Sequence, residues 1–161
     1  MNRRHFIKQT AFAGSAVLSS ALVGASVLNA QSIPEETQLT ILHTNDVHSR
    51  LEPFPMDGSR NQGLGGVAAR ASLIQEIREE NPHTILLDAG DIFQGTPYFN
   101  LYKGEPEIKA MSKMGYDAVT MGNHDFDAGI ENFANQLQYA RFPVVISNYD
   151  FTNTPMESNY K

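Results

Sequence analysis

Short apolar segments alternate with longer amphipathic segments along most of this chain of 161 residues, and this alternation constrains the fold most strongly. Four apolar segments have the length of strands: residues 39–43, 84–88, 117–121 and 142–147. Three segments between them carry apolar residues at helical spacing: residues 64–80, 105–115 and 130–140. Unbroken apolar strands separated by helices are typical of βαβ units. The sequence therefore predicts an α/β fold with a mostly parallel sheet.

Individual residues set the limits of the predicted helices. Pro82 follows Asn81 and ends the first helix, because proline cannot continue one. Pro106 lies in the first turn of the second helix, and Gly115 ends that helix. Asp127 is predicted to cap the N-terminus of the third helix.

The charge balance and the absence of cysteine exclude several classes of protein. The chain carries 12 Lys and Arg residues against 18 Asp and Glu residues. Three of the basic residues lie within the first eight positions, so the remainder carries nine basic against 18 acidic residues, a net charge of −9. Such a body is poorly suited to nucleic acid polymers, although a bound metal ion would still allow phosphate substrates. Without cysteine, disulfides, thiolate nucleophiles and zinc–thiolate sites are excluded.

The N-terminus has the pattern of an export signal. Arg3-Arg4 come shortly before a long segment without charge that ends at Pro34. Paired arginines before such a segment are similar to the twin-arginine export signal of bacteria. The segment is long enough for a membrane anchor, but frequent Gly and Ser residues lower its hydrophobicity. We therefore expect a cleaved signal peptide over residues 1–30, a bacterial protein that is periplasmic or secreted without a stable membrane anchor, and a body over residues 31–161.

Polar side chains follow the first three predicted strands. They are Asp46 and His48 after the first strand, Asp91 after the second, and Asn123, His124 and Asp125 after the third. The carboxyl ends of parallel strands meet at one edge of a sheet, where ligands gather. Carboxylate, imidazole and amide donors without sulfur suit Mn²⁺, Fe or Zn²⁺ and are less typical of Ca²⁺. Asp91 is the central candidate to bridge two ions, and Gly90 before it lets the backbone approach closely.

Three segments together resemble a known family. TNDVH (44–48), LLDAGDIFQGT (86–96) and MGYDAVTMGNHDFDAG (114–129) resemble the metallophosphoesterase (calcineurin-like) superfamily, specifically its 5′-nucleotidase family. The resemblance covers roughly residues 38–150. It implies the first half of an α/β/β/α sandwich and a phosphohydrolase that uses two divalent metal ions.

The resemblance also implies a role for each polar residue of the strand ends. Asp46 and His48 would bind the first ion, Asp91 would bridge the two ions, and Asn123 would bind the second. His124, oriented by Asp125, would stabilise the transition state or protonate the leaving oxygen. Physical chemistry agrees, because two ions about 3.5–4 Å apart generate a hydroxide at neutral pH. Histidine is suited to proton transfer near neutral pH, and a carboxylate on its far nitrogen fixes its tautomer.

The sequence departs from the family in its second half. The family completes its metal site with later histidines and carries a C-terminal domain that binds substrate, whereas this sequence has no histidine after His124. We therefore expect residues 31–161 to be an incomplete part of the catalytic domain that is inactive alone. A C-terminal substrate-binding domain would then lie in the same or another chain.

The function that the sequence favours is an exported, metal-dependent phosphohydrolase of the 5′-nucleotidase type that acts on nucleotide phosphoesters. Two alternatives stay open. The first is a related metallophosphoesterase with a different ester: a cyclic-nucleotide phosphodiesterase, a nucleotide-sugar hydrolase or a thiosulfohydrolase. The second is a truncated module that binds a metal or a partner without catalysis.

Overall fold

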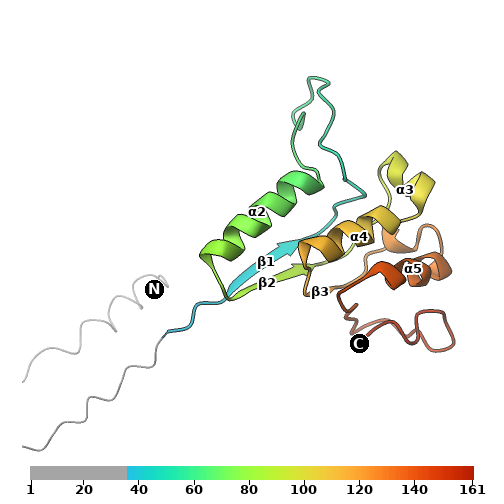
Figure 1. Cartoon of the computed structure of the whole chain (residues 1–161). Coiled ribbons are helices and arrows are strands. Elements are labelled where there is room, and N and C mark those ends of the chain that lie inside the picture. The colour runs from blue at the N-terminus through green and yellow to red at the C-terminus, as the bar shows by residue number, and fades with distance from the viewer. Residues whose placement is uncertain (1–35) are drawn as a thin grey trace, which may run out of the picture. The chain divides into compact units, whose positions relative to one another are not determined.

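A three-stranded parallel sheet lies at the centre of the described structure (Figure 1), a computed structural model that describes residues 36–161. Its strands are β1 (Thr40–Thr44), β2 (Thr84–Asp88) and β3 (Ala118–Val119), in the order β1-β2-β3. The predicted α/β fold class and parallel sheet are confirmed. The predicted signal peptide, residues 1–30, lies outside the described residues.

Helices connect the strands, as the periodicity predicts. They are α2 (Val67–Glu80), α3 (Pro97–Tyr102), α4 (Glu105–Met114) and α5 (Ile130–Gln136), with 3-10 turns η1 (His124–Phe126) and η2 (Leu137–Tyr139). Asn81 ends α2, Pro106 lies in the first turn of α4, and Gly115 ends α4 with a φ of 71°. Within residues 36–161, no helix combines the length and apolar character needed to cross a bilayer.

Two local predictions are wrong, and one helix has no counterpart among the predicted elements. That helix is α3, whose six residues are too few for a helical period to show. Residues 142–147 run beside β3, but only Val144 forms an isolated bridge with Val119, and Pro143 has no N–H to donate to a ladder. Asp127 does not cap α5, which starts after Gly129 without a side-chain cap.

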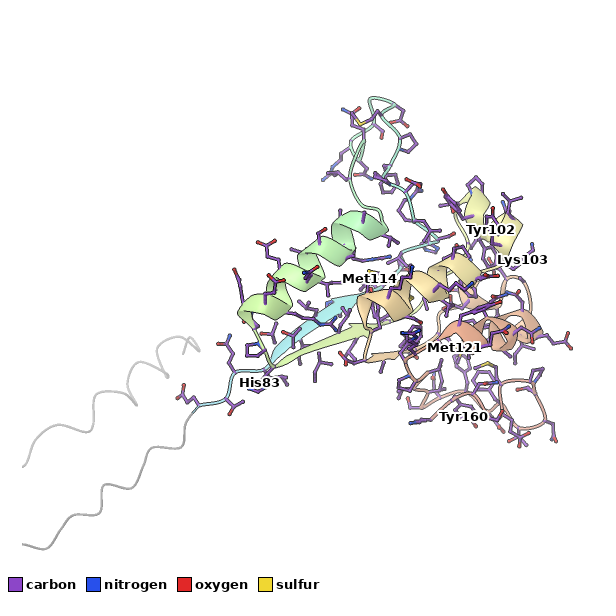
Figure 2. All side chains as sticks on the ribbon, viewed as in Figure 1. His83, Tyr102, Lys103, Met114, Met121 and Tyr160 are labelled. Atoms are coloured by element: carbon purple, nitrogen blue, oxygen red, sulfur yellow. The ribbon has the colours of Figure 1, made fainter. Side chains whose placement is uncertain are left out.

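The helices α2 and α4 cover one face of the sheet and enclose the core. Leu86 of β2 packs there with Ile74 of α2 and Met111 of α4, and Figure 2 shows Met114 between the two helices. On the opposite face of β1, Ile41 is 60% exposed and His43 is also exposed.

A buried carboxyl group joins the ends of the first two strands. Asp88 accepts hydrogen bonds from the Thr44 hydroxyl and from the Gly90 N–H, which lies 2.9 Å away. The Tyr116 hydroxyl lies 2.7 Å from that of Thr44. Burial raises the pKa of Asp88 to about 6, because the ionised form loses its hydration. The two hydrogen bonds and the charge of Arg70 act against this pKa shift, and the charge of Asp125 adds to it.

This pKa shift predicts that the chain loses stability as the pH rises from 4 to 7. Between 3.8, the ordinary pKa of Asp, and about 6, the folded chain binds more protons at Asp88 than the unfolded chain does. The free energy of unfolding therefore falls with rising pH, by about 3 kcal/mol at most from this group. Asp88→Asn does not titrate, so its stability relative to the wild type rises over this pH range. Urea unfolding of both proteins between pH 4 and pH 8 measures the difference.

Asp57→Asn is the matched control for this prediction. Asp57 is exposed, and a hydrogen bond from Ser59 lowers its pKa, so its removal leaves the fall in stability above pH 4 in place. If the two proteins, wild type and Asp88→Asn, keep a constant difference in stability from pH 4 to pH 8, Asp88 does not titrate as described.

Candidate metal centre

Three of the predicted metal ligands meet at the carboxyl ends of β1 and β2. Asp46, His48 and Asp91 each present one ligand atom, and these atoms all lie within 4.8 Å of one another. His48 Nε2 lies 3.8 Å from Asp46 Oδ1 and 4.0 Å from Asp91 Oδ2. The arrangement can hold one divalent cation between two carboxylates and an imidazole, a donor set that suits Mn²⁺, Fe or Zn²⁺.

All three residues adopt a backbone conformation that side chains rarely take. Their φ angles are positive: 51° for Asp46, 45° for His48 and 56° for Asp91. Such conformations cost free energy and are found together mainly at functional sites. Backbone hydrogen bonds hold them in place, because the Asp46 N–H donates to Gly90 O at 3.0 Å and the His48 N–H donates to Asp91 O at 3.0 Å. These hydrogen bonds hold the backbone of the loop after β1 against the loop after β2.

The tautomer of His48 leaves one ring nitrogen free for a metal ion. Its Nδ1 lies 3.3 Å from the carbonyl oxygen of Phe93. A carbonyl can only accept a hydrogen bond, so Nδ1 carries the proton. Nε2, the nitrogen that faces the two carboxylates, is then the one that would coordinate a metal ion, as in metal sites whose histidines are held by a hydrogen bond to the far nitrogen.

Two glycines allow the loop after β2 to touch the loop after β3. A Cβ atom on Gly90 would lie 2.2 Å from Gly122 N, and one on Gly122 would lie 2.0 Å from Asp91 Oδ1. Neither position has room for a side chain, which confirms the close backbone approach expected at Gly90. Asp91 Oδ1 accepts the backbone N–H of His124 at 3.0 Å, so Asp91 connects the metal ligands to the segment GNHD.

Asn123 lies in that segment, next to the residue that Asp91 holds. It precedes the 3-10 turn η1, its side chain is exposed, and its carbonyl accepts the Phe126 N–H at 3.3 Å. Asn123 is thus adjacent in sequence to the residue whose N–H contacts Asp91, and its coordination of a second ion stays a prediction.

His124 has a different carboxylate partner from the one predicted. Its Nδ1 lies 2.8 Å from Oδ2 of Asp127, three residues further along the chain, and its ring centroid lies 5.2 Å from that of His48. The hydrogen bond to Asp127 raises the pKa of His124 and lowers the pKa of Asp127. Gln94 Nε2 also donates to Asp127, at 3.2 Å. Asp127 is therefore the residue that orients His124, whereas its sequence position favours a helix cap.

Asp125 instead joins the loop after β2 to the loop after β3 from inside the protein. It is fully buried and accepts four backbone N–H groups, from Asp91 (3.0 Å), Ile92 (2.8 Å), Phe93 (3.0 Å) and Gly122 (2.9 Å). Burial raises the pKa of Asp125, and the four hydrogen bonds act in the opposite direction. The prediction that Asp125 orients His124 is wrong, because its carboxylate binds these four backbone N–H groups and not the imidazole.

Comparisons with known proteins agree with this geometry. A family model described as calcineurin-like phosphoesterase matches residues 39–160. The 5′-nucleotidase of Bos taurus is 47% identical over 116 residues, which make up 69% of this chain and 20% of that protein. The crystal structure of the 5′-nucleotidase precursor from Thermus thermophilus is 40% identical, with a TM-score of 0.69, over 76% of this chain and 24% of that chain.

A third relative has a different substrate in its name. The Haemophilus influenzae NAD nucleotidase is 31% identical, with a TM-score of 0.68, over 76% of this chain and 23% of that chain. The present chain spans about a fifth to a quarter of the length of these relatives. It belongs to the calcineurin-like phosphoesterases, in their 5′-nucleotidase family.

Proposed function

We propose that this chain is part of an exported phosphohydrolase that cleaves nucleotide phosphoesters with two divalent metal ions. The observation that carries the proposal is the cluster of Asp46, His48 and Asp91, held in left-handed backbone conformations beside the His124–Asp127 pair. Asp46 and His48 would hold the first ion, Asp91 would bridge, and Asn123 would add its amide oxygen to the second ion.

Metal ions bound there would activate water as a nucleophile and neutralise charge on the phosphoryl group. The protein's own contribution to the reaction is the His124–Asp127 pair. Asp127 holds Nδ1 of His124, so the opposite nitrogen, Nε2, is free to donate a proton to the leaving oxygen. Asp125 holds the two loops together and so keeps His124 near Asp91.

The relatives support nucleotides as the substrate class. The proteins from Bos taurus and Thermus thermophilus are named 5′-nucleotidases, so a nucleoside 5′-monophosphate is our first choice. The likeness to the Haemophilus influenzae NAD nucleotidase favours hydrolysis of NAD as the second candidate.

An assay with the protein as its gene encodes it tests the proposal. With Mn²⁺ present, we expect release of phosphate from 5′-AMP, loss of this activity with a chelator, and its return when Mn²⁺ is added back. NAD and bis-p-nitrophenyl phosphate, assayed in parallel, separate the two candidates from a general phosphodiesterase. An inactive protein that still binds Mn²⁺ would instead indicate a module without catalysis.

Export is a separate part of the proposal and rests on Arg3-Arg4. Replacing both arginines with lysine should leave the precursor inside the cell. If cell fractionation shows normal export of the double variant, the twin-arginine route is not used.

A further inference from the structure

A buried polar cluster lies directly behind the residue that follows His48. Its members are Ser49, Thr96 and Glu107, which are 1%, 8% and 3% exposed. Ser49 comes after β1, Thr96 caps α3, and Glu107 lies in the first turn of α4. None of the three takes part in the proposed reaction, so their burial needs another reason.

The hydrogen bonds of this cluster require one more proton than its two hydroxyl groups supply. Ser49 Oγ is hydrogen-bonded to Glu107 Oε1 and lies 2.9 Å from Thr96 Oγ1, and Thr96 Oγ1 lies 3.0 Å from the carbonyl oxygen of Ser49. These are three contacts between oxygen atoms, and each needs one proton. Ser49 and Thr96 supply two. A protonated Glu107 supplies the third.

The surroundings of Glu107 also favour its neutral form. Its second oxygen, Oε2, is buried and has no hydrogen-bond partner. Within residues 36–161, Glu107 takes part in no ion pair, and the nearest charges on its own helix, Glu105 and Lys109, pair with each other. Burial raises the pKa of Glu107, and a hydrogen bond donated by Ser49 to the ionised carboxylate acts in the opposite direction. In the neutral form the direction of this hydrogen bond is reversed.

We propose that Glu107 is a protonated positioning residue that holds His48 in place for metal binding. The proton of Glu107 is donated to Ser49 Oγ, the Ser49 hydroxyl donates to Thr96 Oγ1, and the Thr96 hydroxyl donates to the Ser49 carbonyl. The inference rests on the proposed function, because it assumes that His48 binds a metal ion.

The backbone explains why His48 needs such support. His48 and Ser49 have consecutive positive φ angles of 45° and 56°, which an unsupported loop would not keep. The Ser49 N–H donates to Ile92 O at 2.8 Å, and among the hydrogen bonds of residues 36–161 it is the Ser49 side chain that connects this loop to α4. Without Glu107, the loop is free to relax and to move His48 Nε2 away from Asp91.

Calorimetric titration of the protein with Mn²⁺ tests the positioning role. Glu107→Ala should weaken Mn²⁺ binding by about 10–100-fold, the usual effect of removing a group that supports a metal ligand. Glu107→Gln can donate an N–H to Ser49 Oγ in place of the lost proton, so its Mn²⁺ affinity should stay close to that of the wild type.

Two controls separate positioning from a general loss of stability. Met111→Ala removes a buried side chain from the same helix and should lower stability without weakening Mn²⁺ binding. Glu105→Gln changes a partly exposed carboxylate in the same turn and should change neither property. Equal losses of Mn²⁺ affinity in Met111→Ala and Glu107→Ala, or wild-type affinity in Glu107→Ala, would overturn the positioning role.

Infrared spectroscopy of the metal-free protein at pH 7 tests the protonation independently of metal binding. The carbonyl band of a neutral carboxylic acid should disappear in Glu107→Gln and remain in Glu105→Gln. If that band is unchanged in Glu107→Gln, Glu107 is ionised and the proposed chain of donors is wrong. A wild-type protein that shows this band but binds no Mn²⁺ would contradict the proposed function, and with it the positioning role, while the protonation of Glu107 would stand.

Discussion

Replacing His124 with alanine is expected to lower the turnover of the whole enzyme by about 10²–10⁴-fold while its metal content stays the same. The imidazole is held by Asp127 and lies outside the cluster of Asp46, His48 and Asp91. Its removal therefore takes away a proton donor without taking away a metal ligand. Turnover of 5′-AMP and metal content, measured by elemental analysis of the same preparation, check both parts.

Asp91→Ala is the matched comparison for His124→Ala. Asp91 is the residue expected to bridge two ions, and its Oδ2 faces His48 Nε2 at 4.0 Å. Its loss should deplete the metal itself and remove activity with it. A His124→Ala protein that is also depleted of metal would show that His124 is a ligand, and the division of roles would be wrong.

Replacing Asp125 with alanine is expected to lower the free energy of unfolding by about 3–5 kcal/mol, the usual cost of removing one partner from a buried charged interaction. Four backbone N–H groups, two of them at Asp91 and Gly122, lose their acceptor together. The loops after β2 and β3 are then joined by fewer hydrogen bonds, among them the one from the His124 N–H to Asp91 Oδ1. Chemical denaturation monitored by circular dichroism measures the loss.

Asp127→Ala, which removes a neighbouring carboxylate, is expected to affect turnover rather than stability. Asp127 is exposed, and its partners are the side chains of His124 and Gln94, so the variant should keep most of its stability. It should instead lower turnover, because His124 loses the group that orients it. If Asp125→Ala is stable and Asp127→Ala is not, the anchor and the orienting residue have been assigned the wrong way round.

Most of the fold could be predicted because hydrophobic period and helix limits are local properties of the chain. The strand at 84–88 is observed with the predicted limits, and Gly115 ends α4 as expected. A full strand at 142–147 is not observed. An apolar segment does not show whether each backbone N–H has a partner in a neighbouring strand, and Pro143 has no N–H to donate. The helix α3 could not be predicted, because the only feature that marks its start, a capping residue Thr96 followed by Pro97, is also common outside helices.

The proximity of Asp46, His48 and Asp91 could be predicted because parallel strands bring their carboxyl ends together at one edge of the sheet. The carboxylate partner of His124 could not be predicted, because adjacency in sequence suggests Asp125. The 3-10 turn η1 instead brings Asp127, three residues further along the chain, beside the imidazole ring. The sequence does not predict the burial of Glu107, because an acidic residue in the first turn of a helix is usually exposed to solvent and interacts favourably with the helix dipole.

The left-handed backbone at the three metal ligands limits how this site can change during evolution. A substitution at Asp46, His48 or Asp91 must satisfy both the coordination of an ion and a positive φ angle. Asparagine adopts that conformation readily, whereas valine and isoleucine do not. Single substitutions that weaken metal binding should therefore be tolerated best when Asp46 or Asp91 becomes asparagine, which keeps the loop conformation while it removes the charge.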